Sequence, residues 1–307
     1  MIKLLHIGIE ACSGKWLSSA FHQMTDCKEI NSRGQLDINE IRDVFNNHNP
    51  DIVFLQTQAN KTELLPMVEE MAQTSVVINW CGDVRDSMPE WYREFDKYCV
   101  TCFSNMRDVR EIGGEYLQIG IDPEIYHSKK QEKEFDIVFM ANRSMSFPLS
   151  SYRVQTVDFL RKEYGDRFKL FGNWPGADGN LMGNQDEEAD IYRKSKIGIS
   201  ISHYNIDRYF SDRLLRIMGS GCFALSHNYS GVELDFKVGE HLETFDNFEE
   251  LKQKIDRFLS IVSGGERELI AKKGCRHVHR RFTTKNMVKD VIRIYGKYKD
   301  KSINQLV

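Results

Sequence analysis

The stretch Tyr209–Cys222 reads YFSDRLLRIMGSGC and predicts a short helix that ends at a glycine turn and leads into a buried strand. Ser211 or Asp212 can cap this helix, because their side chains accept hydrogen bonds from the exposed backbone N–H groups of a first turn. The residues expected on its buried side are the apolar ones at helical spacing: Leu214, Leu215 and Met218. A helix followed directly by a buried strand is typical of an α/β fold.

Two arginines, Arg213 and Arg216, lie about one helical turn apart in this stretch, and Arg208 comes just before it. The simpler interpretation is a surface salt-bridge pair. The other is phosphate binding, in which the helix N-terminus and the guanidinium groups together hold a diphosphate. After the following strand, Gly231 can let the backbone approach a ligand, and Glu233 can bind sugar or ribose hydroxyls.

Strand-like and helix-like patterns alternate along the rest of the chain. In the first half the apolar runs are IKLLHIGI (2–9), DIVFLQT (51–57), SVVINW (75–80) and KYCVTCF (97–103). In the second half they are FDIVFMANRS (135–144), RFKLFGN (167–173), KIGISIS (196–202) and CFALSH (222–227). Amphipathic helical patterns separate these runs, so we expect parallel sheets that are covered on both faces.

This order predicts an α/β fold with two tandem Rossmann-like domains and a cleft between them. The charged stretch HSKKQEKEF (127–135) is the predicted boundary. We therefore expect residues 1–126 to form the N-terminal domain and residues 133–283 to form the C-terminal domain. Residues 284–307 are expected to form a C-terminal helix that can pack back on the N-terminal domain.

Composition and charge narrow the class of protein. The formal net charge of the 307 residues is −3, which argues against a surface built for tight, nonspecific binding of polyanions. No apolar run reaches the length of about 18 residues that a membrane span needs, and the first residues read as a strand and not as a signal peptide. Cysteines 81, 99, 102 and 222 lie in apolar runs, which favours buried thiols and a cytoplasmic location over a metal or redox site.

Polar residues that follow the strands are the candidates for a site, because ligands of open parallel sheets bind beyond the carboxyl ends of the strands. Ser13 and Gly14 follow the first strand at an expected helix N-terminus, where an anion can bind, although a plain turn fits equally well. Asp83 follows SVVINW and could deprotonate an acceptor hydroxyl as a general base. The other interpretation of this segment is a helix N-cap at Asp86 or Ser87.

The second half offers further residues at strand ends. Asn142 and Arg143 follow its first strand. The segment FGNWPGADGNLMGNQ (171–185) contains four glycines and three asparagines and is either a ligand-lining loop or a solvent loop. His203 follows a later strand, where it is either a ligand contact or a structural hydrogen-bonding residue.

The passage IGIDPEIYH (119–127), the charged linker and FDIVFMANRS resemble the interdomain passage of nucleotide-sugar glycosyltransferases of the GT-B fold. Residues 210–259 are similar to the donor-binding domain of that family, and AKKGCRHVHRRFTTKNMVKDVI (271–292) is similar to its tail helices. The CgeB-like, spore-maturation branch is the nearest, because there a helix of the pattern S-x-R-x-x-E-x-x-x-x-G precedes a strand and a G-x-E loop. Over residues 1–118 the resemblance is architectural only.

This resemblance implies a glycosyltransferase that moves a sugar from a nucleotide diphosphate sugar, a UDP-sugar above all, to an acceptor hydroxyl. The N-terminal domain would then hold the acceptor and the C-terminal domain the donor. The family implies no permanently bound cofactor and no metal, because positive side chains and a helix N-terminus offset the charge of the diphosphate.

The resemblance also implies roles by position. Ser211 and Arg213 correspond to the start of the phosphate-contacting helix. Asn173 and Trp174 correspond to the place where the nucleobase is usually held. The pair Gly231 and Glu233 corresponds to the G-x-E loop near the sugar.

One position departs from the family pattern. Arg216 stands where many relatives have a glutamate that holds the ribose hydroxyls. Either Glu233 takes over these hydroxyls, or Arg216 adds a contact to the phosphates.

Two alternatives follow from the same residues. Because the helix glutamate is missing, the chain could be a noncatalytic nucleotide-binding or scaffold protein of the same fold. Its acceptor could also be a modified base in DNA, as for some phage enzymes of this fold. The net charge of −3 and the lack of a basic, aromatic-interleaved run in residues 1–118 favour a protein, glycan or small-molecule acceptor.

Overall fold

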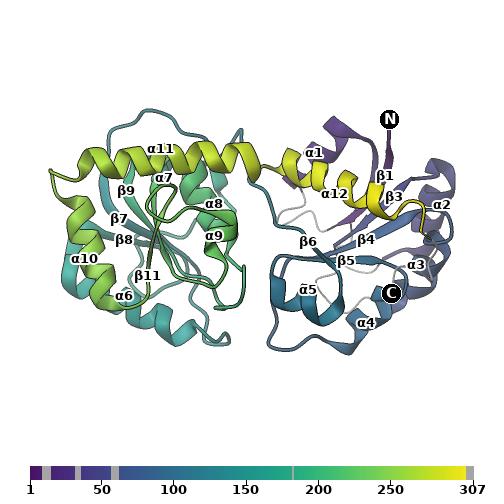
Figure 1. Cartoon of the computed structure of the whole chain (residues 1–307), viewed down its shortest axis with the longest axis horizontal. Coiled ribbons are helices and arrows are strands. Elements are labelled where there is room, and N and C mark those ends of the chain that lie inside the picture. Colours follow the sequence, from purple (N-terminus) through teal and green to yellow (C-terminus); the bar gives the residue numbers. More distant parts are fainter. Residues whose placement is uncertain (9–14, 32–35, 57–61, 182, 302–307) are drawn as a thin grey trace. The chain divides into compact units, whose positions relative to one another are not determined.

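The computed structural model describes residues 1–8, 15–31, 36–56, 62–181 and 183–301 (Figure 1). The chain divides into two compact units. Unit 1 comprises Met1–Gly120 and Thr284–Val307, and unit 2 comprises Ile121–Thr283. The last described helix therefore belongs to the same unit as the first strand, and each unit is described by itself below.

Unit 1 is built on one parallel sheet. Its strands are β1 (Lys3–Gly8), β2 (Asp26–Asn31), β3 (Ile52–Leu55), β4 (Val76–Cys81), β5 (Val100–Phe103) and β6 (Glu115–Tyr116), in the order β2-β1-β3-β4-β5-β6. Its helices are α1 (Lys15–Met24), α2 (Ile38–His48), the 3₁₀ turn η2 (Thr62–Leu64), α3 (Leu65–Met71), α4 (Glu90–Asp96), α5 (Met106–Ile112) and α12 (Thr284–Tyr298). Every paired strand runs parallel to its neighbour.

Both faces of this sheet are covered at its centre, which is why β3 is apolar along its whole length. In β3, Ile52 and Phe54 point to the face that is covered by α1 and α12, and Val53 and Leu55 point to the face covered by α2 and α3. The helix α12 contributes Met287, Val288, Val291 and Ile294 to the first of these cores. The C-terminal helix thus packs on the sheet of the N-terminal half.

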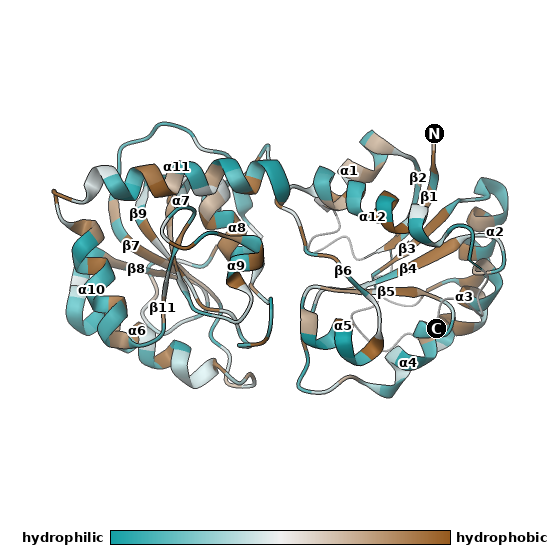
Figure 2. Cartoon of the chain, viewed as in Figure 1, coloured by the Kyte–Doolittle hydropathy of each residue, from teal (hydrophilic) through white to brown (hydrophobic). Residues whose placement is uncertain are grey.

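Unit 2 contains a second parallel sheet. Its strands are β7 (Phe135–Met140), β8 (Phe168–Phe171), β9 (Ser195–Ser200), β10 (Phe223–His227) and β11 (Glu243–Phe245), in the order β11-β10-β9-β7-β8. Its helices are α6 (Ser150–Tyr164), η3 (Gly165–Arg167), α7 (Gln185–Lys194), α8 (Asp212–Gly219), α9 (Val232–Asp235), α10 (Phe248–Leu259) and α11 (Gly264–Arg281). The hydropathy colouring of Figure 2 shows apolar strands and helices that are polar on their outer sides.

The helix α8 lies very close to this sheet. A Cβ atom on Gly198 of β9 would stand 2.7 Å from Cγ2 of Ile217, so the strand needs a glycine there. Leu214, Leu215 and Met218 are buried, as the apolar spacing predicts. This packing fixes the position of the first turn of α8 relative to the strand ends.

The structure adds details that the sequence patterns do not give, among them the short strand β6. The strand β2 was not expected, because only Cys27 and Ile30 of its six residues are buried. The charged segment 127–135 packs on unit 2, where Lys133 Nζ donates to the backbone oxygens of Arg193 (2.7 Å) and Ser195 (2.9 Å). The helix α4 begins after Pro89, so neither Asp86 nor Ser87 caps it.

Candidate donor site

The candidate site lies at the carboxyl ends of the strands of unit 2. The chain passes from β7 to β8 on one side and returns to β9 on the other side of β7. The topological switch point of the sheet is therefore between β7 and β9. In open parallel sheets the crevice beyond such a switch point is the usual place for a ligand.

The first turn of α8 points to this edge and is capped by Ser211. The hydroxyl of Ser211 accepts a hydrogen bond from the backbone N–H of Arg213 (3.4 Å), and the Ser211 N–H donates to Oγ of Ser202 (3.0 Å). The structure thus selects Ser211 as the cap, whereas Asp212 is the first helical residue. A capped N-terminus carries the partial positive charge of the helix dipole to the strand ends.

Arg213 bridges the switch point. Its Nε donates to the carbonyl oxygen of Met140, at the end of β7. Its Nη1 donates to the carbonyl oxygen of Ile201, just beyond β9 (3.1 Å). The guanidinium also lies 5.6 Å from the ring centroid of Phe139, a distance within the range of a cation–π contact. The side chain is therefore held in place before any ligand arrives.

A pocket of about 220 Å³ opens beside Arg213. The structure brings together here four of the predicted residues: Asn142, Asp212, Arg213 and Arg216. The 171–185 segment contributes Gly172, Asn180, Leu181 and Gly183 to the wall. Glu188 of α7 completes the polar lining, and sequence reasoning did not single it out. The predicted ligand-lining loop thus borders this pocket.

Arg216 is bound to two carboxylates. Its Nη2 lies 2.6 Å from Oδ2 of Asp212, and its Nη1 lies 3.0 Å from Oε2 of Glu188. Burial raises the pKa of Asp212, but the charges of Arg216 and Arg213 outweigh this effect, and the pKa is lowered overall. Tyr126 donates its hydroxyl to the same oxygen of Glu188 (3.0 Å). The salt-bridge interpretation of Arg216 is therefore the one the structure shows.

Arg208 turns away from this pocket. It forms a bidentate ion pair with Asp235, with Nε and Nη2 each 2.8 Å from a carboxylate oxygen. The side chain of Asp235 is fully buried, and Arg208 adopts a left-handed backbone conformation with φ of 54°. Of the three arginines near the opening stretch, this one stabilises the fold around α9.

Sequence reasoning missed Arg153, which is only 2% exposed on α6. Its Nη2 donates to the carbonyl oxygen of Asn142 (3.1 Å), and its Nη1 lies 2.8 Å from Nε2 of His203. Burial, Arg153 and Arg213 lower the pKa of His203 to about 3, so the imidazole is neutral near pH 7. No local pattern marks Arg153, because its partners come from two other loops.

The remaining predicted donor residues have different surroundings. Asn173 is exposed and accepts a hydrogen bond from the backbone N–H of Arg143, whose side chain is also exposed. Trp174 is 7% exposed and belongs to the hydrophobic core, and its indole N–H donates to the carbonyl oxygen of Ala141. The indole is therefore packed in the core below the strand ends, and its ring faces are not open for stacking with a nucleobase.

The G-x-E segment forms the start of α9. Gly231 has φ of 81°, and a Cβ atom there would stand 2.8 Å from Oδ1 of Asp207. This position therefore requires glycine for both conformation and space. Glu233 is exposed on α9 and is not part of the pocket lining.

The candidates of the N-terminal half belong to unit 1. Asp83 is exposed after β4, and its carbonyl oxygen accepts a hydrogen bond from Arg85 Nη1 (3.4 Å). Ser13 and Gly14 lie outside the described residues. The six described cysteines are all buried and free, as predicted for those in apolar runs.

The described residues contain neither a metal-binding cluster nor a membrane-spanning helix. No group of three or more His, Cys, Asp or Glu side chains in that part of the chain is arranged to hold a metal ion. Among the helices of the same residues, none is long and apolar enough to cross a membrane.

Residues 153–293, just under half of the chain, match the model of a glycosyl transferase-like family. This part of the chain is therefore similar to a glycosyltransferase domain. The matched region contains α8, Arg153 and Glu188, and so includes most of the candidate site. A comparison with curated proteins finds no match.

Solved structures share the fold of this chain over nearly its whole length. A glycosyltransferase from Rickettsia africae superposes with a TM-score of 0.70 at 13% identity, covering 98% of this chain and 99% of that one. Anabaena HepE in complex with UDP and glucose gives 0.65 at 10% identity, with coverage of 97% and 100%. Sucrose-phosphate synthase from Thermosynechococcus elongatus gives 0.65 at 9%, with coverage of 97% and 99%. These similarities establish the GT-B fold.

Proposed function

We propose that the protein transfers a sugar from a UDP-sugar to an acceptor hydroxyl, and that the pocket beside Arg213 holds the donor diphosphate. The observation that carries this proposal is the Arg213 guanidinium, fixed across the switch point between the carbonyl oxygens of Met140 and Ile201. The complex of Anabaena HepE with UDP and glucose supports UDP as the nucleotide. The S-x-R helix and the G-x-E loop support placing the chain in the CgeB-like branch.

The positive groups around the pocket suit a diphosphate leaving group. The capped N-terminus of α8 presents backbone N–H groups, and Arg213 is held beside it in the pocket lining. Arg143 follows β7 and is exposed outside that lining. Hydrogen bonds from such groups stabilise the negative charge that develops as the sugar leaves. In this proposal the transfer needs no metal ion.

We infer that Glu188 supplies the carboxylate that binds the ribose hydroxyls. It lines the pocket, it sits next to Arg216, and Arg216 occupies the position where many relatives have a glutamate. Glu233 is the alternative, but it is exposed outside the pocket lining.

Asp83 is proposed as the general base that removes the proton of the acceptor hydroxyl. It belongs to the N-terminal unit, which is the expected acceptor domain. Asp83→Asn should then abolish turnover while nucleotide binding is retained. Unchanged turnover would remove Asp83 from the mechanism.

The central experiment is isothermal titration with UDP, GDP and their sugars. UDP should bind, and Arg213→Ala should weaken binding by about 1–3 kcal/mol, the scale of a hydrogen bond to a charged group. The matched control is Arg42→Ala, which removes an exposed arginine that pairs with Glu70 in unit 1. A lack of binding by every nucleotide at millimolar concentration would contradict the proposal.

A noncatalytic nucleotide-binding protein is the second candidate. The ion pairs of Arg216 with Glu188 and Asp212 favour this second candidate, because they engage the guanidinium that would otherwise contact the phosphates. Slow release of free sugar from the donor without acceptor distinguishes the two, since a binder alone would release none. The acceptor is proposed to be a protein, glycan or small molecule, and salt-sensitive binding of duplex DNA would reverse this preference.

A further inference from the structure

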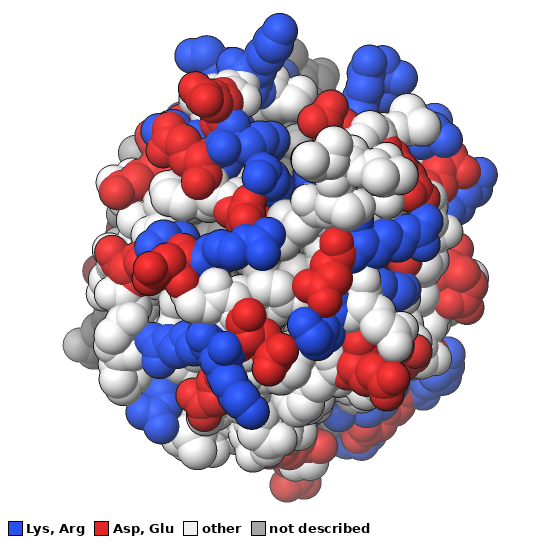
Figure 3. Space-filling view, turned by 90° about the vertical axis from the view of Figure 1, so that its left-hand side faces the viewer, with Lys and Arg blue, Asp and Glu red and all other residues white. Residues whose placement is uncertain are grey.

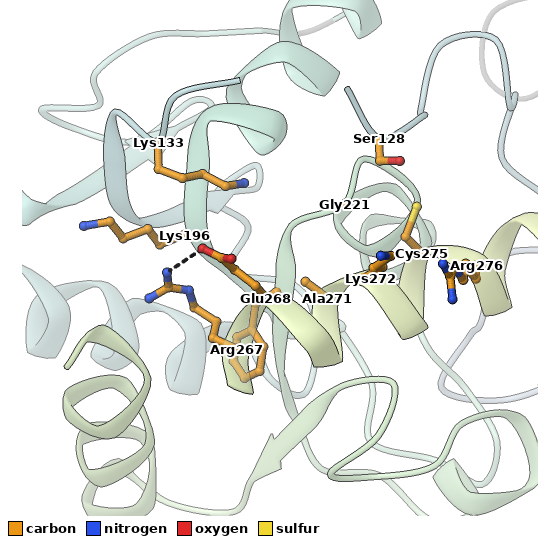
Figure 4. Close-up of a pocket in the computed structure, with 11 residues that line it drawn as sticks. Ser128, Lys133, Lys196, Gly221, Arg267, Glu268, Ala271, Lys272, Cys275 and Arg276 are labelled. Atoms are coloured by element: carbon orange, nitrogen blue, oxygen red, sulfur yellow. Dashed lines mark ion pairs between the residues drawn. The ribbon is translucent and has the colours of Figure 1, made fainter. Parts of the chain in front are cut away.

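A second pocket of unit 2 lies at the amino ends of the strands, at the other end of the sheet from the candidate donor site. Its volume is about 390 Å³. Lys196 is the second residue of β9, Phe223 is the first of β10, and Lys133 comes two residues before β7, so the pocket opens at the amino ends of these strands. It shares no lining residue with the donor pocket at the carboxyl ends. The helix α11 forms one wall, and the 127–134 segment forms another (Figure 4).

The lining of this pocket is strongly basic. It contains five basic side chains and one acidic side chain: Lys133, Lys196, Arg267, Lys272 and Arg276, with Glu268. Elsewhere on unit 2, over the face around α10, basic and acidic side chains are interspersed (Figure 3). The one-sided charge is therefore a local feature in a chain whose net charge is −3.

Only part of this positive charge is compensated by carboxylates. Lys196 pairs with Asp136 at 2.6 Å. Arg267 lies 3.8 Å from Glu268, whose side chain is 72% exposed, so water screens this pair. Within the described part of the chain, the other three cations (Lys133, Lys272 and Arg276) have no ion-pair partner.

Two of the cations are held by backbone oxygens. Lys133 uses two of its three N–H bonds on the carbonyl oxygens of Arg193 and Ser195, which leaves the third free for a ligand. Arg267 Nη1 donates to the carbonyl oxygen of Phe258 at 2.6 Å, which leaves Nη2 toward the pocket side where Glu268 lies (Figure 4). These contacts orient the two side chains without neutralising them.

The positive charges of Lys133 and Arg267 also act on the buried thiol of Cys222. Burial raises the pKa of the Cys222 thiol to about 11, and the charges of Lys133 and Arg267 oppose this rise. The opposite wall is tight, because a Cβ atom on Gly221 would stand 2.9 Å from Cβ of Ser128. The pocket thus has a closed side at Ser128 and Gly221 and fixed positive charge on the other side.

We propose that this pocket binds a compact anion that carries a phosphate group. Its volume falls in the range of small-molecule sites, about 300–1,000 Å³. Lysine and arginine side chains that lack carboxylate partners bind phosphate oxygens by charge-assisted hydrogen bonds. The site is separate from the donor pocket and does not depend on the proposed transfer reaction.

Titration with inorganic pyrophosphate tests this inference. The double variant Lys272→Ala/Arg276→Ala removes two exposed cations from the α11 wall of the pocket, and it should weaken binding at this site by at least about tenfold. The control is Lys285→Ala/Lys289→Ala, which removes the same charge from the exposed side of α12 in unit 1. Ser128→Glu, which adds a carboxylate at the rim, should weaken binding as well. Equal affinity of all four proteins would overturn the proposal.

Hydrogen–deuterium exchange locates the bound pyrophosphate, since the donor pocket could also take a diphosphate. Protection is expected in the 127–134 segment and the first half of α11. Protection confined to residues 140–143 and 211–216 would place the anion at the donor pocket and overturn the inference.

The phosphate group could come from a free metabolite or from a lipid headgroup. The turn before α11 exposes Ile261 (99%) and Val262 (95%), a pair that could enter a membrane surface. Sedimentation with vesicles of phosphatidylcholine and phosphatidic acid separates the sources. Binding to vesicles that Lys272→Ala/Arg276→Ala abolishes indicates a lipid, whereas pyrophosphate binding without vesicle binding indicates a free anion.

Discussion

Arg216 and Glu188 form an ion pair at the wall of the donor pocket, with Nη1 of the arginine 3.0 Å from Oε2 of the glutamate. The pair places a carboxylate next to Arg216 in the lining of this pocket. The charge is supplied from α7, and the arginine holds it in place together with Tyr126.

The first prediction concerns Glu188→Gln. This change keeps the size of the side chain but removes the charge, so hydrogen bonds to ribose hydroxyls should weaken. We expect UDP to lose about 1–2 kcal/mol of binding free energy, and 2′,3′-dideoxy-UDP to lose much less. Isothermal titration of both ligands measures the difference.

Asp186→Asn is the matched control, because it removes an exposed carboxylate from the first turn of the same helix. It should leave the ratio of the two affinities unchanged. If Glu188→Gln also leaves that ratio unchanged, Glu188 does not bind the ribose.

The second prediction concerns the buried ion pair of Arg208 and Asp235. Asp235→Asn would leave the guanidinium of Arg208 without its charged partner, and breaking such a buried pair costs about 3–5 kcal/mol. Urea denaturation should show this loss. Asp290→Asn breaks an exposed pair with Arg293 and should cost about 1 kcal/mol or less. Similar losses in both variants would contradict the structural role of Asp235.

Apolar runs and cap residues in the sequence predicted those strands and helix ends that depend on residues close together in the chain. Four strands of each sheet (β1, β3, β4 and β5; β7, β8, β9 and β10) correspond to the predicted runs because their residues are mostly apolar. A cap at Ser211 or Asp212 was predicted because a cap and the N–H groups that it binds lie within one turn, and the structure selects Ser211. The strand β2 was missed, since an edge strand with two buried residues has no distinctive pattern.

The polar contacts of the site could be predicted only in part. Arg213 was singled out by its place after a strand, but its partners Met140 and Ile201 lie on two different strands. Arg153 reads as an ordinary surface residue of an amphipathic helix, although it is buried. Such contacts join residues that are far apart in the sequence. They therefore produce no regular spacing of residues from which they could be predicted.

The third prediction uses Gly231, which has φ of 81°. Gly231→Ala puts a Cβ atom 2.8 Å from Asp207 in a conformation that other residues rarely adopt, so stability should fall by about 1–2 kcal/mol. Gly265→Ala in α11 meets open space and should be neutral or stabilising by up to about 1 kcal/mol. Thermal melting compares the two, and a stable Gly231→Ala variant would show that the loop adapts.

The fourth prediction concerns pH. In the folded protein the pKa of His203 is lowered to about 3, whereas an unfolded histidine has about 6.5, so the unfolded state binds the extra proton between these values. The contribution of neutral His203 to the free energy of unfolding is therefore complete above about pH 6.5 and is lost as the pH falls toward 3. His203→Asn should reduce the loss of stability between pH 7.5 and pH 5, as measured by urea midpoints at both values. His22→Asn removes a half-exposed imidazole and should keep the acid sensitivity of the unaltered protein. An unchanged slope in His203→Asn would mean that burial, Arg153 and Arg213 together do not hold this ring neutral.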